Sequence, residues 1–209
     1  MRRLLADWIA LDERYQGDRP RVRAVRSVRC GDAPYVFTAP HAVRHVRAGV
    51  LKKADIRTGG LAEVLARHAG GAALTSLGRL AVDPNFDSGE TPFRKRLLET
   101  LRPGQLVLDL HGMDDRHGVD VVIGLGSRPD HRSQAAADLL QRILAAAGLS
   151  VRCGHPFPAT HPGTVTSTVQ AAGFSALQVE VAARRRRPLR DPDSTLPLLA
   201  ALLRWAAAG

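Results

Sequence analysis

The stretch QLVLDL, residues 105–110, is a nearly continuous apolar run that contains one aspartate and leads directly into a histidine. Runs of this kind are typical of strands buried on both faces, as in the sheets of α/β proteins. Three other runs have the same character, namely 34–39 (PYVFTA), 119–124 (VDVVIG) and 176–182 (ALQVEVA). We therefore expect these runs to be strands of one sheet.

Segments with helical patterns alternate with these runs along the chain. The predicted helices span 58–69, with Thr58 as N-cap, 91–101, 131–147 and 192–207. Further short strands are predicted at 78–83 and 150–153, and a loop rich in Pro and Gly at 154–165. Strands that alternate with helices predict a three-layer αβα sandwich with a mostly parallel mixed sheet.

The composition fits one globular domain that covers residues 1–209. Hydrophobic residues make up 44% of the chain, and the two cysteines, Cys30 and Cys153, form no CxxC pair. We therefore expect a reducing, cytoplasmic location without a disulfide framework. The start of the chain, MRRLLADWIALDER, is interrupted by Asp7, and no apolar run approaches the roughly 18 residues of a membrane span. Neither a signal peptide nor a membrane segment is expected.

The formal net charge is +10, and nearly all of the excess is arginine. A basic chain can bind nucleic acid, but its arginines are scattered over 2–26, 79–102 and 184–190. Aromatic residues make up only 4% of the chain, so a platform that stacks bases is not expected. The pattern favours a solvated basic surface over a nucleic-acid partner.

Polar residues lie at the ends of the predicted strands, where the active sites of such sheets are found. They are His41 at the end of 34–39, Asp83 and Asn85 at the end of 78–83, Asp109 in 105–110 with His111 at its end, and Glu180 in 176–182. Two imidazoles and a carboxylate, with a fourth position open to water, form the ligand set of a catalytic zinc site. The strand ends therefore predict a metal-dependent hydrolytic site.

Glu180 stands in an otherwise apolar strand, where an unpaired carboxylate is costly to bury. One interpretation makes it the general base of the reaction, and the other pairs it with a nearby arginine such as Arg184. His45, four residues after His41, has a helical ligand spacing. Because Pro40 argues against a regular helix there, His45 is kept as a reserve metal ligand.

Six motifs in order resemble the N-formylglutamate amidohydrolase family, a relative of the zinc carboxypeptidases and of the succinylglutamate desuccinylase and aspartoacylase group. The motifs are APHA (39–42), KKADIRTGGLAEVLA (52–66), GRLAVDPNFD (78–87), LDLHGM (108–113), HPGTVTSTVQAAG (161–173) and LQVEV (177–181). The resemblance implies a phosphorylase/hydrolase-like αβα fold and a single Zn²⁺ as cofactor.

The resemblance also implies roles for particular residues. It maps the zinc ligands to His41, Asp55 and His111, and the catalytic glutamate to Glu180. Asp55 is not found by the search of strand ends. The carboxypeptidase relatives carry their acidic ligand three residues after the first histidine, where this chain has Arg44.

Asp83 and Asp109 are expected behind the metal ligands, because zinc-bound histidines usually donate their other N–H to a carboxylate or carbonyl. The segment Asp83-Pro84-Asn85-Phe86 departs from the DxNR pattern of the family, in which the arginine helps to bind a substrate carboxylate. Here phenylalanine replaces that arginine, so an acidic group cannot be bound in the same way. We expect Phe86 in the substrate pocket and N-formylglutamate to be a poor substrate. The other expected substrate-binding residues are Asn85, His161 and Thr164, with Arg79 and Arg184 as possible replacements for the missing arginine.

The sequence thus predicts a zinc hydrolase that cleaves an amide bond of a small N-acyl amino acid or a short peptide. Deacylase and carboxypeptidase activity both remain open at this point, as do the native metal and the oligomeric state. No nucleic acid or membrane is expected as a partner. The alternative is a catalytically silent family member that acts as a basic binding domain for an acidic partner.

Overall fold

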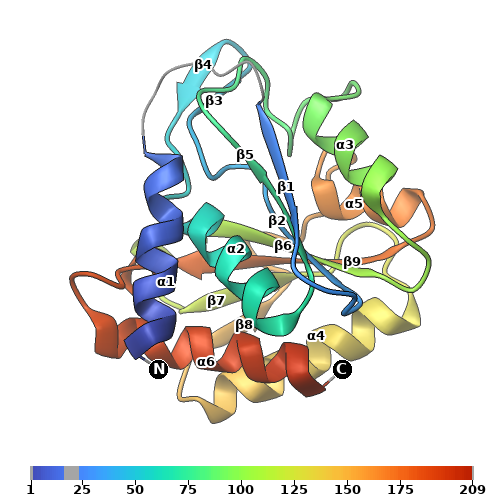
Figure 1. The fold of residues 1–209 in the computed structure, drawn as a ribbon. Helices are drawn as coiled ribbons and strands as arrows, with labels where there is room; N and C mark the ends of the chain where they lie inside the picture. The colour runs from blue at the N-terminus through green and yellow to red at the C-terminus, as the bar shows by residue number, and fades with distance from the viewer. Residues whose placement is uncertain (1, 17–23, 209) are drawn as a thin grey trace.

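The computed structural model describes residues 2–16 and 24–208, so residues 17–23 of the arginine-rich stretch 2–26 lie outside it (Figure 1). Within these residues, seven strands form one sheet in the order β1-β5-β2-β6-β9-β7-β8. They are β1 (Val25–Arg29), β2 (Tyr35–Ala39), β5 (Ala72–Ser76), β6 (Leu106–Met113), β7 (Val121–Gly124), β8 (Val151–Cys153) and β9 (Ser175–Ala182). A separate hairpin consists of β3 (His45–Arg47) and β4 (Val50–Lys52).

The centre of the sheet is parallel. Strands β5, β2, β6 and β9 run in one direction, whereas β1 and β7 are antiparallel to their neighbours β5 and β9. Because the four central strands share a direction, their carboxyl ends meet at the same edge of the sheet. Of the four apolar runs predicted as strands of one sheet, three lie in this parallel centre. The fourth, 119–124, forms β7, which runs antiparallel to β9.

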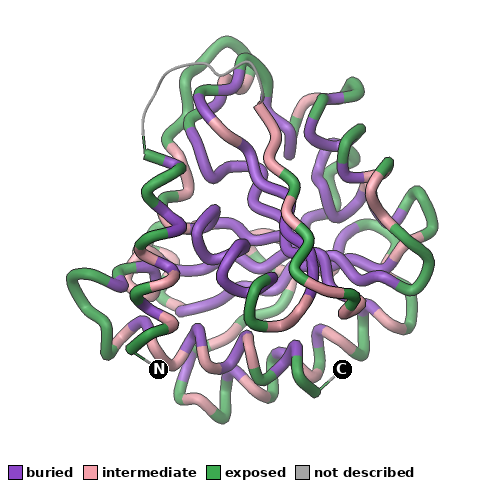
Figure 2. The backbone as a smooth tube through the Cα atoms, in the orientation of Figure 1, coloured by how far each residue is buried: buried purple, intermediate pink, exposed green. Residues whose placement is uncertain are grey.

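Helices cover both faces of the sheet (Figure 1). One face packs against α1 (Arg2–Asp12), α2 (Thr58–Ala69), α4 (His131–Ala146) and α6 (Pro192–Ala208). The other packs against α3 (Pro92–Thr100) and α5 (Val165–Ala171). The central strands are buried along their lengths (Figure 2). The predicted three-layer αβα sandwich with a mostly parallel mixed sheet is therefore confirmed.

Alternation along β6 decides which side chains can reach a site. Leu106, Leu108 and Leu110 belong to the core under α1, α2, α4 and α6, whereas Val107 belongs to the core under α3 and α5. Successive side chains of a strand point to opposite faces. The side chains of Asp109 and His111 therefore point to the face covered by α3 and α5, near the carboxyl edge of the sheet.

Two predictions about secondary structure are wrong. Residues 78–83 form no strand; only Leu80 makes an isolated bridge to His45, and Gly78 turns the chain with φ +65°. The strand lies earlier, at β5, whose short run AALTS is fully buried. Thr58 is not the N-cap of α2 but its first residue, and its hydroxyl donates to the carbonyl of Asp55 at 2.7 Å.

Several elements were not predicted, namely α1, β1, the β3–β4 hairpin and α5. The missed α5 begins inside the motif at 161–173, where the Thr164 side chain caps it by accepting a hydrogen bond from the Ser167 amide. None of the described helices combines the length and the apolar character needed to cross a bilayer.

Candidate metal centre and substrate pocket

Three segments at the carboxyl edge of the sheet bring a cluster of titratable side chains together. His41 follows β2, His111 lies in β6, and Asp55 lies in the turn that precedes α2. Nδ1 of His111 is 3.3 Å from Oδ2 of Asp55, and Nδ1 of His41 is 3.6 Å from the same oxygen. The three predicted metal ligands thus converge on one point.

The spacing of these three atoms suits a zinc ion. Ligand atoms at 2.0–2.2 Å from a tetrahedral ion lie about 3.3–3.6 Å from one another. The two distances to the Asp55 oxygen have these values. The donor set, two imidazoles and one carboxylate, is also one that zinc accepts. The residues present therefore fit the metal that the resemblance implies.

Each histidine is held from behind by a buried carboxylate. Nε2 of His41 is 2.7 Å from Oδ1 of Asp83, and Nε2 of His111 is 2.9 Å from Oδ2 of Asp109. Asp109 is fixed in turn by the hydroxyl of Thr38, which donates to its other oxygen at 2.5 Å. When Nε2 carries the only ring proton, the Nδ1 of each histidine, which faces Asp55, has a lone pair free for a metal. This is the arrangement in which outer carboxylates orient metal-binding histidines.

The turn that carries Asp55 is fixed by α1. The indole of Trp8 donates to the carbonyl of Arg57 at 2.9 Å, and the Arg57 guanidinium donates to Asp12 at the same distance. Gly60 permits this contact, because a Cβ there would meet Trp8 and Asp12 at less than 3 Å. The unpredicted helix α1 therefore positions one of the three candidate ligands.

The electrostatics of the cluster follow from burial and from its excess of carboxylates. Burial lowers the pKa of His111, but the charge and hydrogen bond of Asp109 outweigh it, so the pKa lies well above its ordinary value. Burial would raise the pKa of Asp55, but hydrogen bonds that His111 and His41 donate when their Nδ1 atoms are protonated hold it below its usual range. Buried charges of this kind are normally paired or coordinate a metal. The cluster favours a cation.

Glu180 of β9 completes the cluster. Burial raises the pKa of its carboxyl to about 7, and the neighbouring charge of Asp55 adds to the rise, while His111 opposes it. Its Oε1 accepts a hydrogen bond from Gln178 at 3.1 Å. The predicted alternative of a Glu180–Arg184 ion pair is wrong, because Arg184 pairs with Asp120 at 2.9 Å and with Asp115.

His45 is not brought to Asp55 and His111. Its ring stacks on that of His41, with centroids 4.0 Å apart, and its Nε2 lies 3.3 Å from Asp83 without hydrogen-bond geometry. His41, His45 and Asp83 form a second group of potential ligands. However, His41 and Asp83 are within hydrogen-bond distance of each other, closer than two ligands of one zinc ion lie. The guanidinium of Arg47 also donates a hydrogen bond to Asp83. The group around Asp55 is therefore the better candidate for a metal site.

A pocket of about 550 Å³ opens over the cluster. The predicted substrate-binding residues that line it are Asn85, Phe86, His161 and Thr164. The rings of Phe86 and His161 stack in parallel at 4.7 Å, and the Arg47 guanidinium lies over Phe86 at 4.8 Å. These three side chains form one wall of the pocket.

Arg79 and Arg184, the suggested replacements for the missing arginine, do not line this pocket. Arg79 is exposed elsewhere, and Arg184 is held by its two aspartates. The cations that do line it are Arg47, from the unpredicted β3–β4 hairpin, and Arg116. Their sequence neighbourhoods contain no signal that would have placed them there.

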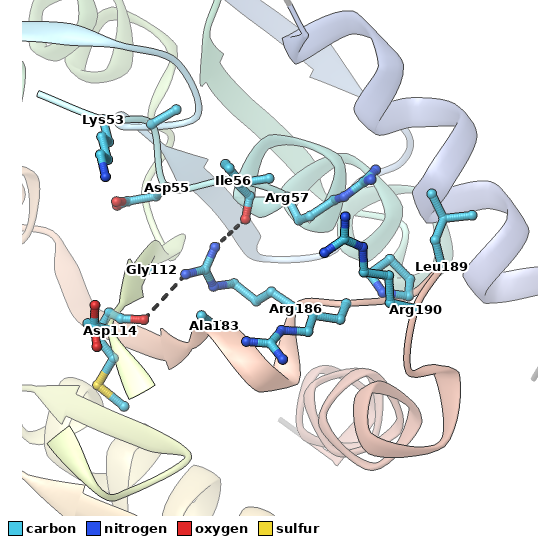
Figure 3. A pocket seen from close by; sticks show the side chains of 14 residues that line it. Lys53, Asp55, Ile56, Arg57, Gly112, Asp114, Ala183, Arg186, Leu189 and Arg190 are labelled. Atoms are coloured by element: carbon cyan, nitrogen blue, oxygen red, sulfur yellow. Dashed lines mark hydrogen bonds between the residues drawn. The ribbon is translucent and has the colours of Figure 1, made fainter. Parts of the chain in front are cut away.

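Arg186 was also missed, and it joins the segments that carry the cluster. Its buried guanidinium donates to the backbone carbonyls of Ile56, Met113 and Val181. It takes the space beside Gly112, where a Cβ would overlap it; Figure 3 shows Arg186 between Gly112 and Ile56. Ile56 follows Asp55 and Val181 follows Glu180 in the sequence, so one side chain fixes the backbone next to both.

Comparison with known proteins supports the fold. No family model matches the chain, and no curated protein matches it. The N-formylglutamate amidohydrolase from Ralstonia eutropha has a TM-score of 0.66 at 15% identity, over 90% of this chain and 98% of that one. A bacteriophage poly-γ-glutamate hydrolase has a TM-score of 0.61 at 15% identity, over 90% of this chain and 91% of that one. An N-acetylmuramyl-L-alanine amidase from Mycobacterium abscessus has a TM-score of 0.51 at 12% identity, over 85% of this chain and 98% of that one. The fold implied by the sequence motifs is therefore confirmed.

Proposed function

We propose that this chain is a zinc-dependent hydrolase that cleaves an amide bond, with His41, Asp55 and His111 as the metal ligands. The observation that carries the proposal is the convergence of two Nδ1 atoms on one oxygen of Asp55. Buried carboxylates hold the opposite nitrogen of each ring. A hydrogen-bonded histidine in a loop would need only one such partner, whereas a metal ligand uses both nitrogens.

A bound Zn²⁺ supplies a polarised substrate carbonyl and a water whose pKa falls to about 7. Glu180 accepts the proton of the attacking water on its carboxylate and returns it to the departing nitrogen. Burial raises the pKa of Glu180, which helps its carboxyl to return the proton to the departing nitrogen.

The pocket over the cluster accommodates a small N-acyl amino acid or a short peptide. The stacked rings of Phe86 and His161 offer a flat apolar surface to the group beside the scissile bond. The charge of Arg47 is largely compensated by Asp83, to which its Nε donates. Two of the proteins with this fold are named as an amidohydrolase and an amidase, which supports amide cleavage.

The experiment is a metal analysis combined with a substrate screen. Purified protein should contain about one zinc per chain and should hydrolyse members of a panel of N-acyl amino acids and dipeptides. A chelator should abolish the activity, and added zinc should restore it. Preference for the dipeptides would indicate a carboxypeptidase, and preference for the N-acyl amino acids a deacylase. Protein that holds no metal and cleaves nothing would support the alternative of a silent binding domain.

A further inference from the structure

A second pocket, of about 720 Å³, adjoins the candidate metal centre (Figure 3). It shares Asp55, Gly112, Met113 and Asp114 with the first pocket, so the two adjoin at Asp55. The first pocket lies toward Phe86, and the second lies toward the segment that follows β9. A substrate that fills both would therefore pass across Asp55.

The second pocket is strongly cationic. Its basic lining residues are Lys53, Arg57, Arg186, Arg187 and Arg190, against the two carboxylates of Asp55 and Asp114. Asp55 already faces the two imidazoles. A concave surface lined by one sign of charge focuses its field and attracts ions of the opposite sign.

The five cations differ in how far they are compensated. Arg186 donates its hydrogen bonds to backbone carbonyls. Arg57 forms an ion pair with Asp12, and Arg187 forms one with Asp115. In the part of the chain that the structure describes, the side chains of Lys53 and Arg190 make no hydrogen bond and no ion pair. Both are exposed at the pocket. These two are the charges available to a ligand.

The rest of the lining selects the kind of anion. It contains no aromatic ring on which a base could stack, which disfavours a nucleic acid. Ile56 and Leu189, exposed by 64% and 61%, lie beside the cations. Such a surface suits carboxylates carried on short methylene chains, because the methylenes contact the apolar side chains while the carboxylates meet Lys53 and Arg190.

We propose that this second pocket binds the acidic residues of a peptide, so that the substrate is a glutamate-rich chain spanning both pockets. The proposal rests on the proposed function, since it places the scissile amide at the metal centre between them. Each pocket alone falls in the size range of a drug-like ligand site, about 300–1,000 Å³. Together they exceed what one N-acyl amino acid would fill.

The test measures binding of fluorescein-labelled hexaglutamate by anisotropy to the Glu180→Gln protein supplied with Zn²⁺, so that binding is separated from cleavage. Lys53→Ala combined with Arg190→Ala should weaken binding about 5- to 20-fold, as expected for two partly exposed ion pairs. The double variant should also reduce the dependence of binding on salt. Arg204→Ala, which removes an exposed cation from α6, is the matched control and should change nothing.

Hexaglutamine should bind more weakly than hexaglutamate. Equal binding of the two peptides, tighter binding of hexathymidylate, or a double variant that behaves like Arg204→Ala would each overturn the inference. The proposed function is judged separately, by cleavage of neutral N-acyl amino acids by the wild type. If these are cleaved while hexaglutamate shows no preference, amide hydrolysis stands and the acidic substrate is wrong.

Discussion

His111 of β6 lies directly opposite Glu180 of β9 in the parallel ladder between the two strands. Both side chains therefore point to the same face of the sheet, at the same position along the two strands. Their common register explains how a candidate metal ligand and a candidate base can share one site although 69 positions separate them in the sequence. Arg186 fixes this pair by bonding to the backbone of both strands, at Met113 and Val181.

Glu180→Gln separates proton transfer from metal binding. The amide keeps the size and the hydrogen-bonding reach of the carboxylate but cannot accept a proton from water. We expect this variant to fold, to retain zinc and to lose roughly 10²–10⁴-fold in kcat, the usual share of general acid–base catalysis. His111→Ala should instead lose the metal. Near-normal turnover by Glu180→Gln, or loss of its zinc, would contradict the assigned role.

Phe86 should determine the kcat/KM of the enzyme for substrates that carry an acidic amino acid. N-Formylglutamate would place its carboxylates near a phenyl ring, where the DxNR pattern provides a guanidinium, and Arg47, the cation that lies over that ring, is bound to Asp83. We expect a lower kcat/KM for N-formylglutamate than for N-formylphenylalanine. Phe86→Arg should narrow or reverse the difference, whereas Phe86→Leu, which stays apolar, should not. Efficient cleavage of N-formylglutamate by the wild type would disprove this prediction.

Arg186 should be a positioning residue. Arg186→Met keeps much of the volume but leaves three buried carbonyls without their donor, which should reduce the free energy of unfolding by about 2–4 kcal/mol. Because two of these carbonyls, those of Ile56 and Val181, adjoin Asp55 and Glu180, zinc affinity should fall as well, even at temperatures where the variant is folded. Arg187→Met, a change at the exposed neighbour, serves as the control in urea unfolding and zinc titration. Loss of stability with unchanged zinc affinity would show that Arg186 is merely structural.

Asp120 should make stability depend on pH. Burial would raise the pKa of this carboxyl, but hydrogen bonds from Arg185 and Ser150 outweigh it, and the pKa is lowered. A group with a lowered pKa in the folded state stabilises the protein above its unfolded pKa of about 3.9 and loses that contribution as the pH falls. Asp120→Asn should therefore lower the free energy of unfolding by about 1.5–3 kcal/mol at pH 7.

The difference between wild type and Asp120→Asn should shrink as the pH is lowered from 5 toward 3, when measured by urea unfolding at each pH. Asp138→Asn, which changes an exposed carboxylate on α4, should show little difference at any pH. A deficit in Asp120→Asn that is constant between pH 3 and pH 7 would mean that the charge of Asp120 does not contribute.

The sequence predicted those parts of the site that lie on buried strands. His111 and Glu180 could be found because each interrupts or follows an apolar run, and a sheet places the ends of such runs together. Asp55 lies in an irregular turn, so only the family resemblance indicated it. The carboxylates behind the histidines followed from the chemistry of zinc-bound imidazole.

The rest could not be predicted for physical reasons. Arg186 acts through backbone carbonyls of three distant segments, and such contacts leave no periodic pattern in a sequence. Arg47 reaches the pocket from the β3–β4 hairpin, whose strands have three residues each. The strand expected at 78–83 was misplaced because its apolar run LAV partly faces solvent, while the strand that pairs in the sheet is the less hydrophobic AALTS.

The proposed function depends on one zinc ion bound by His41, Asp55 and His111. The most direct measurement is a crystal structure of the zinc-supplied protein with anomalous data at the zinc edge. We expect one anomalous peak about 2.0–2.2 Å from Nδ1 of both histidines and from a carboxylate oxygen of Asp55. A peak coordinated instead by His41, His45 and Asp83, or no peak at the site at full zinc supply, would contradict it.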